Sequence, residues 1–222
     1  MSLYIVATPI GNLKDITFRA LDTFKDAEII LAEDTRRTSI LLNHYGISHK
    51  KMISYNDFNK EKKTPSIIYD LKQDKNIVLV SDSGTPGISD PGFNLIRESI
   101  KNGISVIPIP GPTASIAALI GSGFATDSFV FYGFIPKKEK AKMDFFNNIK
   151  DNCKTTIIYE SPYRLIKTLD IMKEIMPERE ICIARELTKK FEEFIRGSVL
   201  DVYNKLKDTS IKGEITIIIN KQ

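Results

Sequence analysis

Short apolar runs alternate with segments of helical periodicity in the first half of the chain. The apolar runs have the length and β-branched content of buried strands, and they cover residues 3–7, 29–32, 76–80 and 104–109. Between them, apolar side chains recur every three or four residues, as on one face of a helix. The helical segments lie around residues 16–27, 40–45, 66–72 and 93–100. This alternation predicts a largely parallel, doubly wound sheet.

The second half of the chain has a less regular pattern, but strands and helices are expected there too. Strands are expected at residues 129–134, 155–159, 181–184 and 214–219. A helix that stops before Pro177 is expected after residue 160, because Leu165, Leu169 and Met172 fall on one face. We therefore expect two α/β domains, residues 1–114 and 115–222.

Two lysine-rich segments have two possible interpretations. Residues 48–65 are polar and basic, with Tyr55 and Phe58 interleaved, and we expect an exposed connection there followed by a helix around residues 66–72. Residues 137–142 form a second basic segment, which should interrupt the structure after the strand at 129–134. The default expectation for both groups of lysines is solvated surface, and the alternative is contact with RNA.

Composition narrows the class of protein. The 222 residues are 42% hydrophobic and 27% charged, as in an ordinary globular protein with a substantial core. No apolar run has membrane-spanning length, and Cys153 and Cys182 lack the spacing of a disulfide framework or a zinc site. We expect a cytoplasmic protein without a metal. The net charge of +4 permits a polyanionic partner without requiring one.

The most distinctive segment of the first half is a glycine- and proline-rich loop. Residues 81–92 join the strand at 76–80 to the next helix and contain three glycines and two prolines. The free N–H groups of such a loop, beside a helix N-terminus, suit the polar end of a small ligand. Other strand ends also carry unusual residues, at 9–12, 33–37, 110–114, 159–164 and 185–189. Ligands bind at the carboxyl ends of strands in open α/β sheets, so one interdomain cleft could collect all of these segments.

Common catalytic and nucleotide-binding motifs are missing. No Gly-Lys-Ser/Thr follows the loop as in a P-loop, and Gly121 and Gly123 lack the third glycine of a dinucleotide fingerprint. The histidines, His44 and His49, lie in the early exposed-looking segment, which gives a Ser/His/Asp triad little support. Cys182 is expected to be buried packing inside a strand. The charged run at 33–36 is either a helix cap with ion pairs or part of a functional site.

Taken together, six segments resemble those of one enzyme family. They are residues 8–13 (TPIGNL), 32–36 (AEDTR), 81–92 (SDSGTPGISDPG), 110–114 (PGPTA), 159–164 (YESPYR) and 184–189 (ARELTK). In this order they resemble the ribosomal RNA small-subunit (cytidine-2'-O)-methyltransferases, members of the tetrapyrrole-methylase-like superfamily. The longer members of that family carry a helical tail after the last strand, which has no counterpart in these residues.

The resemblance implies an α/β fold of two domains, with S-adenosyl-L-methionine bound in a cleft between them, and a homodimer. It implies small-subunit (16S) ribosomal RNA as the substrate, in an assembled 30S subunit, and no membrane partner. Carried over position by position, the cofactor-binding residues are Pro9, Ser83, Gly84, Thr85, Ile88, Thr113, Ala114, Tyr159 and Leu187.

The implied reaction is methyl transfer to the 2'-hydroxyl of a cytidine ribose, for which no metal is signalled. Alignment of the reacting groups should contribute more to this reaction than a general base. The candidates for base or hydrogen-bonding partner are Asp34, Glu160 and Glu186. The candidates for RNA contact are Arg36, Arg164, Arg185 and Lys189, and the alternative for each arginine is an interdomain ion pair.

Three other functions stay open at this point. The first is methylation of a tetrapyrrole carbon with the same cofactor, which the segments at 33–36 and 185–189 resemble less closely. The second is an RNA-binding module that keeps the fold without catalysis. The third is an oxidoreductase, against which the missing glycine fingerprint argues.

Overall fold

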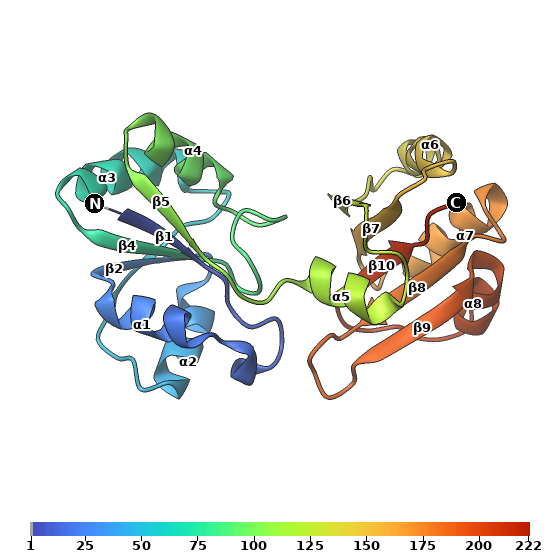
Figure 1. The fold of residues 1–222 in the computed structure, drawn as a ribbon, viewed down its shortest axis with the longest axis horizontal. Helices are drawn as coiled ribbons and strands as arrows, with labels where there is room; N and C mark the ends of the chain where they lie inside the picture. The colour runs from blue at the N-terminus through green and yellow to red at the C-terminus, as the bar shows by residue number, and fades with distance from the viewer. Residues whose placement is uncertain (1) are drawn as a thin grey trace. The chain divides into compact units, whose positions relative to one another are not determined.

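The computed structural model describes residues 2–222, and the chain forms two compact units, Met1–Thr113 and Ala114–Gln222 (Figure 1). Each unit is built around one five-stranded sheet. None of the helices within residues 2–222 is long and apolar enough to cross a membrane.

The first unit contains a fully parallel sheet with the strand order β3-β2-β4-β1-β5. The strands are β1 (Ser2–Val6), β2 (Ile29–Ala32), β3 (Lys51–Ser54), β4 (Asn76–Val80) and β5 (Ser105–Ile109). The helices are η1 (Leu13–Asp15), α1 (Phe18–Asp26), α2 (Thr35–His44), α3 (Lys60–Lys72) and α4 (Phe93–Lys101). The prediction of a parallel, doubly wound sheet is confirmed.

Helices cover both faces of this sheet. Helices α1 and α2 lie on one face and α3 and α4 on the other (Figure 1). Phe24 of α1 packs with Val6 and Ile30 on the first face, whereas Leu71 of α3 packs with Leu3 on the second. The chain thus leaves β1 toward one face and leaves the neighbouring β4 toward the other. This is the switch point at which α/β sheets bind ligands.

The second unit contains a mixed sheet with the order β6-β7-β10-β8-β9. Strand β6 is parallel to β7, whereas β10 is antiparallel to both β7 and β8, and β8 is antiparallel to β9. The strands are β6 (Phe129–Phe134), β7 (Thr155–Glu160), β8 (Glu180–Arg185), β9 (Glu193–Ser198) and β10 (Ile215–Ile219). The helices are α5 (Ala114–Ser122), α6 (Glu139–Ile149), α7 (Leu165–Ile175) and α8 (Val199–Leu206).

The expectation of an exposed connection over residues 48–65 is wrong. This segment contains β3 and the first turns of α3, and Tyr55 is completely buried in the core. Its hydroxyl lies 3.0 Å from Oγ1 of Thr64. Three lysines near the start of the helix (Lys60, Lys62 and Lys63) and Pro65 inside it hide the helical pattern, because charged residues and proline are typical of loops.

The expectation for the basic segment 137–142 is wrong in two respects. Helix α6 begins within it, at Glu139, and Lys142 is buried at 3% exposure instead of solvated. Strand β9 and helix α8 were not expected either. Only Ile195 of β9 is buried, since β9 is an edge strand, so its apolar pattern is weak.

Candidate functional site

The loop after β4 is tied to the ends of both neighbouring connections in the first unit. Thr8, after β1, exchanges two backbone hydrogen bonds with Gly84, at 2.9 and 3.0 Å. The hydroxyl of Thr85 donates to the carbonyl oxygen of Pro112, after β5, at 3.2 Å. These contacts bring together the segments that hold six of the expected cofactor-binding residues: Pro9, Ser83, Gly84, Thr85, Ile88 and Thr113.

Glycine at position 84 has a structural reason. Its φ is +79°, a region that side-chain-bearing L-residues rarely adopt. A Cβ there would lie 3.5 Å from Cγ2 of Ile10 and 3.9 Å from the carbonyl oxygen of Pro112. Those distances are ordinary van der Waals contacts, so glycine is required here by the backbone turn and not by lack of space.

The loop also presents backbone donors. Within residues 2–222, the N–H groups of Ser83, Thr85 and Gly87 donate to no other protein group. Ile88 is 44% exposed beside them. The loop thus offers N–H groups and one apolar side chain to a ligand at the switch point of the sheet.

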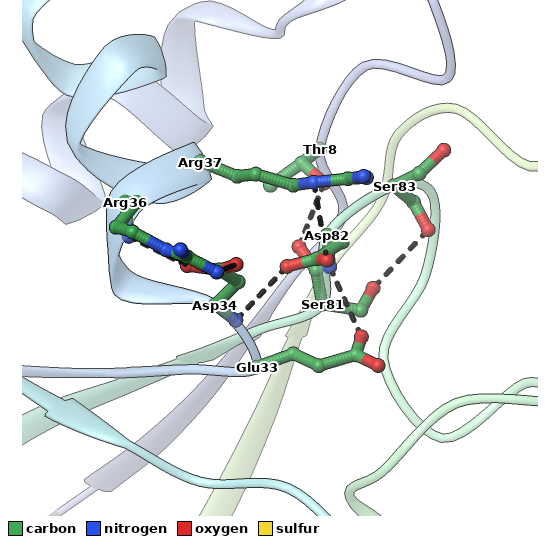
Figure 2. A network of polar contacts seen from close by, with 8 residues as sticks. All are labelled: Thr8, Glu33, Asp34, Arg36, Arg37, Ser81, Asp82 and Ser83. Carbon is green, nitrogen blue, oxygen red and sulfur yellow. Dashed lines mark hydrogen bonds and ion pairs between the residues drawn. The ribbon is translucent and has the colours of Figure 1, made fainter.

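A network of carboxylates joins the ends of β2 and β4 (Figure 2). Asp82 Oδ1 accepts the backbone N–H of Asp34 at 2.9 Å, and Glu33 Oε2 accepts the backbone N–H of Asp82 at 3.3 Å. Arg37 approaches the other oxygen of Asp82 at 3.6 Å. These reciprocal contacts fix the two strand ends relative to each other.

Asp34 is the N-cap of α2. Its carboxylate accepts the backbone N–H of Arg36 at 2.9 Å and pairs with the Arg36 guanidinium at 3.0 and 2.6 Å. The hydrogen bonds from the Arg36 side chain and backbone lower the pKa of Asp34 to about 2. Such a carboxylate is a poor proton acceptor at neutral pH, because an effective base has a pKa near the working pH.

Two other carboxyl groups near the loop have raised pKa values. Burial, reinforced by the charge of Glu33, raises the pKa of Asp90 to about 6. Burial also raises the pKa of Glu33; the hydrogen bond from the Asp82 backbone N–H opposes this rise, and the charge of the Asp82 carboxylate adds to it. Neither group is among the candidates predicted from the sequence. Acidic residues follow β2 and β4 in the sequence, and this pattern could have indicated them. Its meaning depends on β2 and β4 being neighbours, which only the strand order shows.

Glu160, at the end of β7, lies in a buried polar cluster of the second unit. Lys142 of α6 approaches Oε2 at 3.3 Å, and the Thr168 hydroxyl of α7 donates to the same oxygen at 2.7 Å. Arg164 approaches Oε1 at 2.6 Å, and the Ser161 backbone N–H donates to Oε1 at 2.7 Å. Both oxygens thus have protein partners, and the carboxylate joins β7 to two helices.

The segment after β8 holds the remaining charged candidates. Arg185 pairs with Glu193 at 3.1 Å, whereas Lys189 pairs with Glu186 at 2.9 Å and with Glu214 at 3.0 Å. The hydrogen bond from Lys189 lowers the pKa of Glu186. All of these ion pairs, and that of Arg164, join residues of the same unit. None is the interdomain pair considered from the sequence.

The three expected cofactor-binding residues of the second unit lie in different surroundings. Ala114 is the first residue of α5, and Leu187 is buried after β8. Tyr159 of β7 is half-buried and makes edge contacts with the rings of Phe131 and Phe134, with centroids 4.9 and 5.5 Å away.

Comparison with known proteins places these features in one family. Residues 2–202 match the family described as Tetrapyrrole (Corrin/Porphyrin) Methylases. The chain is 49% identical over 218 residues to ribosomal RNA small subunit methyltransferase I of Halalkalibacterium halodurans, covering 98% of this chain and 75% of that protein. It is 46% identical over 224 residues to the Hydrogenobaculum protein of the same name, covering all of this chain and 96% of that protein.

Solved structures support the same fold at much lower identity. Diphthine synthase superposes with a TM-score of 0.76 at 14% identity, over 99% of this chain and 90% of that one. Uroporphyrin-III C-methyltransferase of Thermus thermophilus, in complex with S-adenosylhomocysteine, gives a TM-score of 0.68 at 14% identity, over 99% and 97% of the two chains.

Proposed function

The chain belongs to the ribosomal RNA small subunit methyltransferase I family of the tetrapyrrole methylases, and on this premise we propose that it methylates the 2'-hydroxyl of a cytidine ribose in small-subunit ribosomal RNA. The observation that carries the proposal is the 46–49% identity over nearly the whole chain to proteins of that name. The tetrapyrrole alternative rests on the description of the broader family and on structures that are only 14–16% identical, which bear on the fold alone.

The methyl donor is S-adenosyl-L-methionine, and the loop after β4 fits it. The donor has a carboxylate, which suits the N–H groups of Ser83, Thr85 and Gly87. It also has a positively charged sulfonium and amine, which suit the neighbouring acidic side chains Glu33, Asp82 and Asp90. We assign the polar end of the donor to this loop. We extend the assignment to Ala114, Tyr159 and Leu187 of the second unit, which would contact the same donor.

The chemistry depends on positioning more than on a strong base. Bringing the ribose hydroxyl into line with the donor can supply roughly 7–11 kcal/mol of the barrier reduction. A general base typically adds about 10²–10⁴-fold. Among the candidates from the sequence, Asp34 and Glu186 have lowered pKa values, and Glu160 is enclosed by protein partners. Asp90, with a pKa of about 6, is better matched to accept a proton near neutral pH.

The expected RNA-contacting cations divide into two groups. Arg36 pairs with Asp34, but its side chain is 87% exposed, so it can also reach a phosphate. Arg164, Arg185 and Lys189 are more enclosed and each pairs with a carboxylate. We propose that these three orient the segments after β7 and β8, and that phosphate contact falls to Arg36. We also propose a cytoplasmic homodimer acting on the assembled 30S subunit.

The test has two steps on the purified chain. Calorimetric titration with S-adenosyl-L-methionine measures binding of the donor. Methyl transfer to 30S subunits that lack the modification, followed by mapping of ribose methylation, then measures the reaction. We expect binding and a 2'-O-methyl mark on one cytidine. Binding without transfer to RNA would favour a tetrapyrrole substrate, and RNA binding without donor binding would indicate a non-catalytic module.

A further inference from the structure

We propose that three exposed aromatic side chains of the second unit, Phe134, Tyr163 and Phe191, form a stacking platform for unpaired nucleotides of the RNA substrate. We call these three residues the aromatic platform. The inference rests on the proposed function, since it names the part of the RNA that the second unit contacts.

The sheet topology brings the three residues to one edge. Phe134 is the last residue of β6 and lies beside Tyr159 in the parallel neighbour β7. Tyr159 and Ala184 of β8 both lie opposite Thr216 of the intervening strand β10, so β6, β7 and β8 end at the same edge. Adjacent strands are about 4.8 Å apart, so these three strand ends span about 14 Å.

The loops at this edge carry the other two rings. Tyr163 lies three residues after β7, in a turn in which Arg164 N–H donates to the Ser161 carbonyl oxygen at 3.0 Å. Phe191 lies in the connection between β8 and β9, which closes at the pair Arg185 and Glu193. The platform residues thus lie at the end of β6 and in the segments that follow β7 and β8.

The rings are exposed although they are large and apolar or amphipathic. Tyr163 is 94% exposed, Phe191 64% and Phe134 61%. Phe134 is also held in place, because its ring makes an edge contact with Tyr159 at 5.5 Å between centroids. A held ring with an exposed face loses little conformational entropy when a flat partner stacks on it.

Cations beside the platform point to a polyanion. Within the described residues, Lys137, Lys138 and Lys140 take part in no ion pair, and with Glu139 they give residues 137–140 a net charge of +2. All of them are exposed. Lys190 Nζ lies 5.6 Å from the centroid of the Phe191 ring. By contrast, Arg185 and Lys189 are already neutralised by carboxylates.

Aromatic rings interleaved with unpaired lysines suit single-stranded RNA. Its bases have free faces that stack on aromatic side chains, while its phosphates take the lysines. A duplex keeps its base faces inside the stack and offers the rings nothing comparable. Tyr159 is in contact with Phe134 and is assigned to the methyl donor, so nucleotides on the platform would lie next to the reacting ribose.

The test compares RNA binding by the full chain and single variants. Fluorescence anisotropy would measure affinity for a short labelled single-stranded RNA and for a duplex of the same length. We expect Tyr163→Ala and Phe134→Ala each to weaken single-strand binding about 5- to 100-fold and to leave weak duplex binding unchanged. Tyr163→Phe keeps the ring and should bind like the wild type. Phe18→Ala is the matched control, because Phe18 is 88% exposed in the first unit.

The contribution of the lysines can be measured separately, from the salt dependence of RNA affinity. Replacing Lys137, Lys138 and Lys140 together by serine should reduce the slope of log affinity against log salt concentration by about 2 for single-stranded RNA. Tyr163→Ala should leave that slope unchanged, because stacking releases no counterions. Thermal unfolding of every variant checks that the fold is intact.

Wild-type affinity in both alanine variants, or equal losses in Tyr163→Ala and Tyr163→Phe, would overturn the platform. A change of oligomeric state in sedimentation, with RNA affinity unchanged, would also overturn it and would assign these rings to a contact between copies of the chain. Donor binding and methyl transfer by the wild-type protein test the proposed function separately. If the wild type methylates 30S subunits and both alanine variants bind RNA normally, the platform fails and the function stands.

Discussion

Lys142 Nζ lies 3.3 Å from a carboxylate oxygen of Glu160, and both side chains are almost completely buried. The lysine comes from α6 and the glutamate from the end of β7. Thr168 of α7 completes the cluster, since Lys142 Nζ donates to its hydroxyl at 2.6 Å. The cluster therefore fixes two helices against the strand that carries Tyr159.

Removing the lysine should destabilise the protein. Lys142→Met keeps the bulk of the side chain but leaves the buried Glu160 carboxylate with fewer partners. Breaking a buried ion pair at one end costs about 3–5 kcal/mol, and the remaining Arg164 contact favours the lower value. Urea unfolding would measure the loss. Lys140→Met is the control, because Lys140 is an exposed neighbour in the same helix. Equal stability of the two variants would show that the buried pair contributes nothing.

Gly84 should be essential for binding the donor. Gly84→Val meets an unfavourable φ of +79°, at a cost of about 1–2 kcal/mol, and adds a side chain to the loop surface beside Ile10 and Pro112. We expect Gly84→Val to lower the affinity for S-adenosyl-L-methionine at least about tenfold by calorimetry. Gly46→Val is the matched control, because Gly46 has a φ of +68° with nothing within 4 Å of an added Cβ. A folded Gly84→Val protein with wild-type affinity would remove the loop from the donor site.

Much of the architecture of the first unit could be predicted, because buried parallel strands leave a strong signal. The run at 29–32 is apolar throughout and the run at 76–80 is apolar after Asn76, and each coincides with a strand of the sheet. The loop after β4 was also recognisable from its glycines and prolines. Its attachment to Thr8 could not be predicted, because that contact joins residues far apart in the sequence and depends on β1 and β4 being neighbours.

The failures have a common physical cause. Lys142 and Tyr55 were assigned to the surface from their polar neighbours, yet each is buried because a specific partner satisfies its polar atoms. A lysine is expected in water unless it is paired, and pairing is invisible in a single sequence. The same holds for Asp90, whose pKa is raised first by burial and then by the charge of Glu33 from another element, and neither is visible in a single sequence.

Tyr55 provides a direct test of whether residues 48–65 are packed against the core or form an exposed connection. Tyr55→Ala should destabilise the first unit by about 3–5 kcal/mol, because it empties a fully buried site. Tyr55→Phe keeps the ring and removes only the hydroxyl, with its hydrogen bonds to Thr64 and Asn94, and should cost about 1–3 kcal/mol. Phe58→Ala, three residues further on at a fully exposed site, should be close to neutral. Similar melting temperatures for Tyr55→Ala and Phe58→Ala would instead support the original prediction that residues 48–65 form an exposed connection.

Asp90 should make stability depend on pH in a defined direction. Its folded-state pKa of about 6 lies above the ordinary value of 3.8, so the folded protein holds this proton more tightly than the unfolded chain does. The contribution to stability is therefore fully present below about pH 4, and it is lost as the pH rises through 6. Glu33, Asp82 and Asp57 contribute repulsion, whereas a hydrogen bond from Ser81 opposes the shift.

The test is the difference between the wild type and Asp90→Asn, which cannot titrate. Relative to the variant, the wild type should lose about 1–2 kcal/mol of unfolding free energy between pH 4 and pH 7, a value reduced for partial exposure of the carboxyl group. Urea unfolding across this range measures both proteins. Asp144→Asn, an exposed position in α6, controls for removal of one negative charge. Parallel curves for the wild type and Asp90→Asn would mean that Asp90 has the same pKa in the folded protein as in the unfolded chain, and its suitability as a proton acceptor near neutral pH would fall with it.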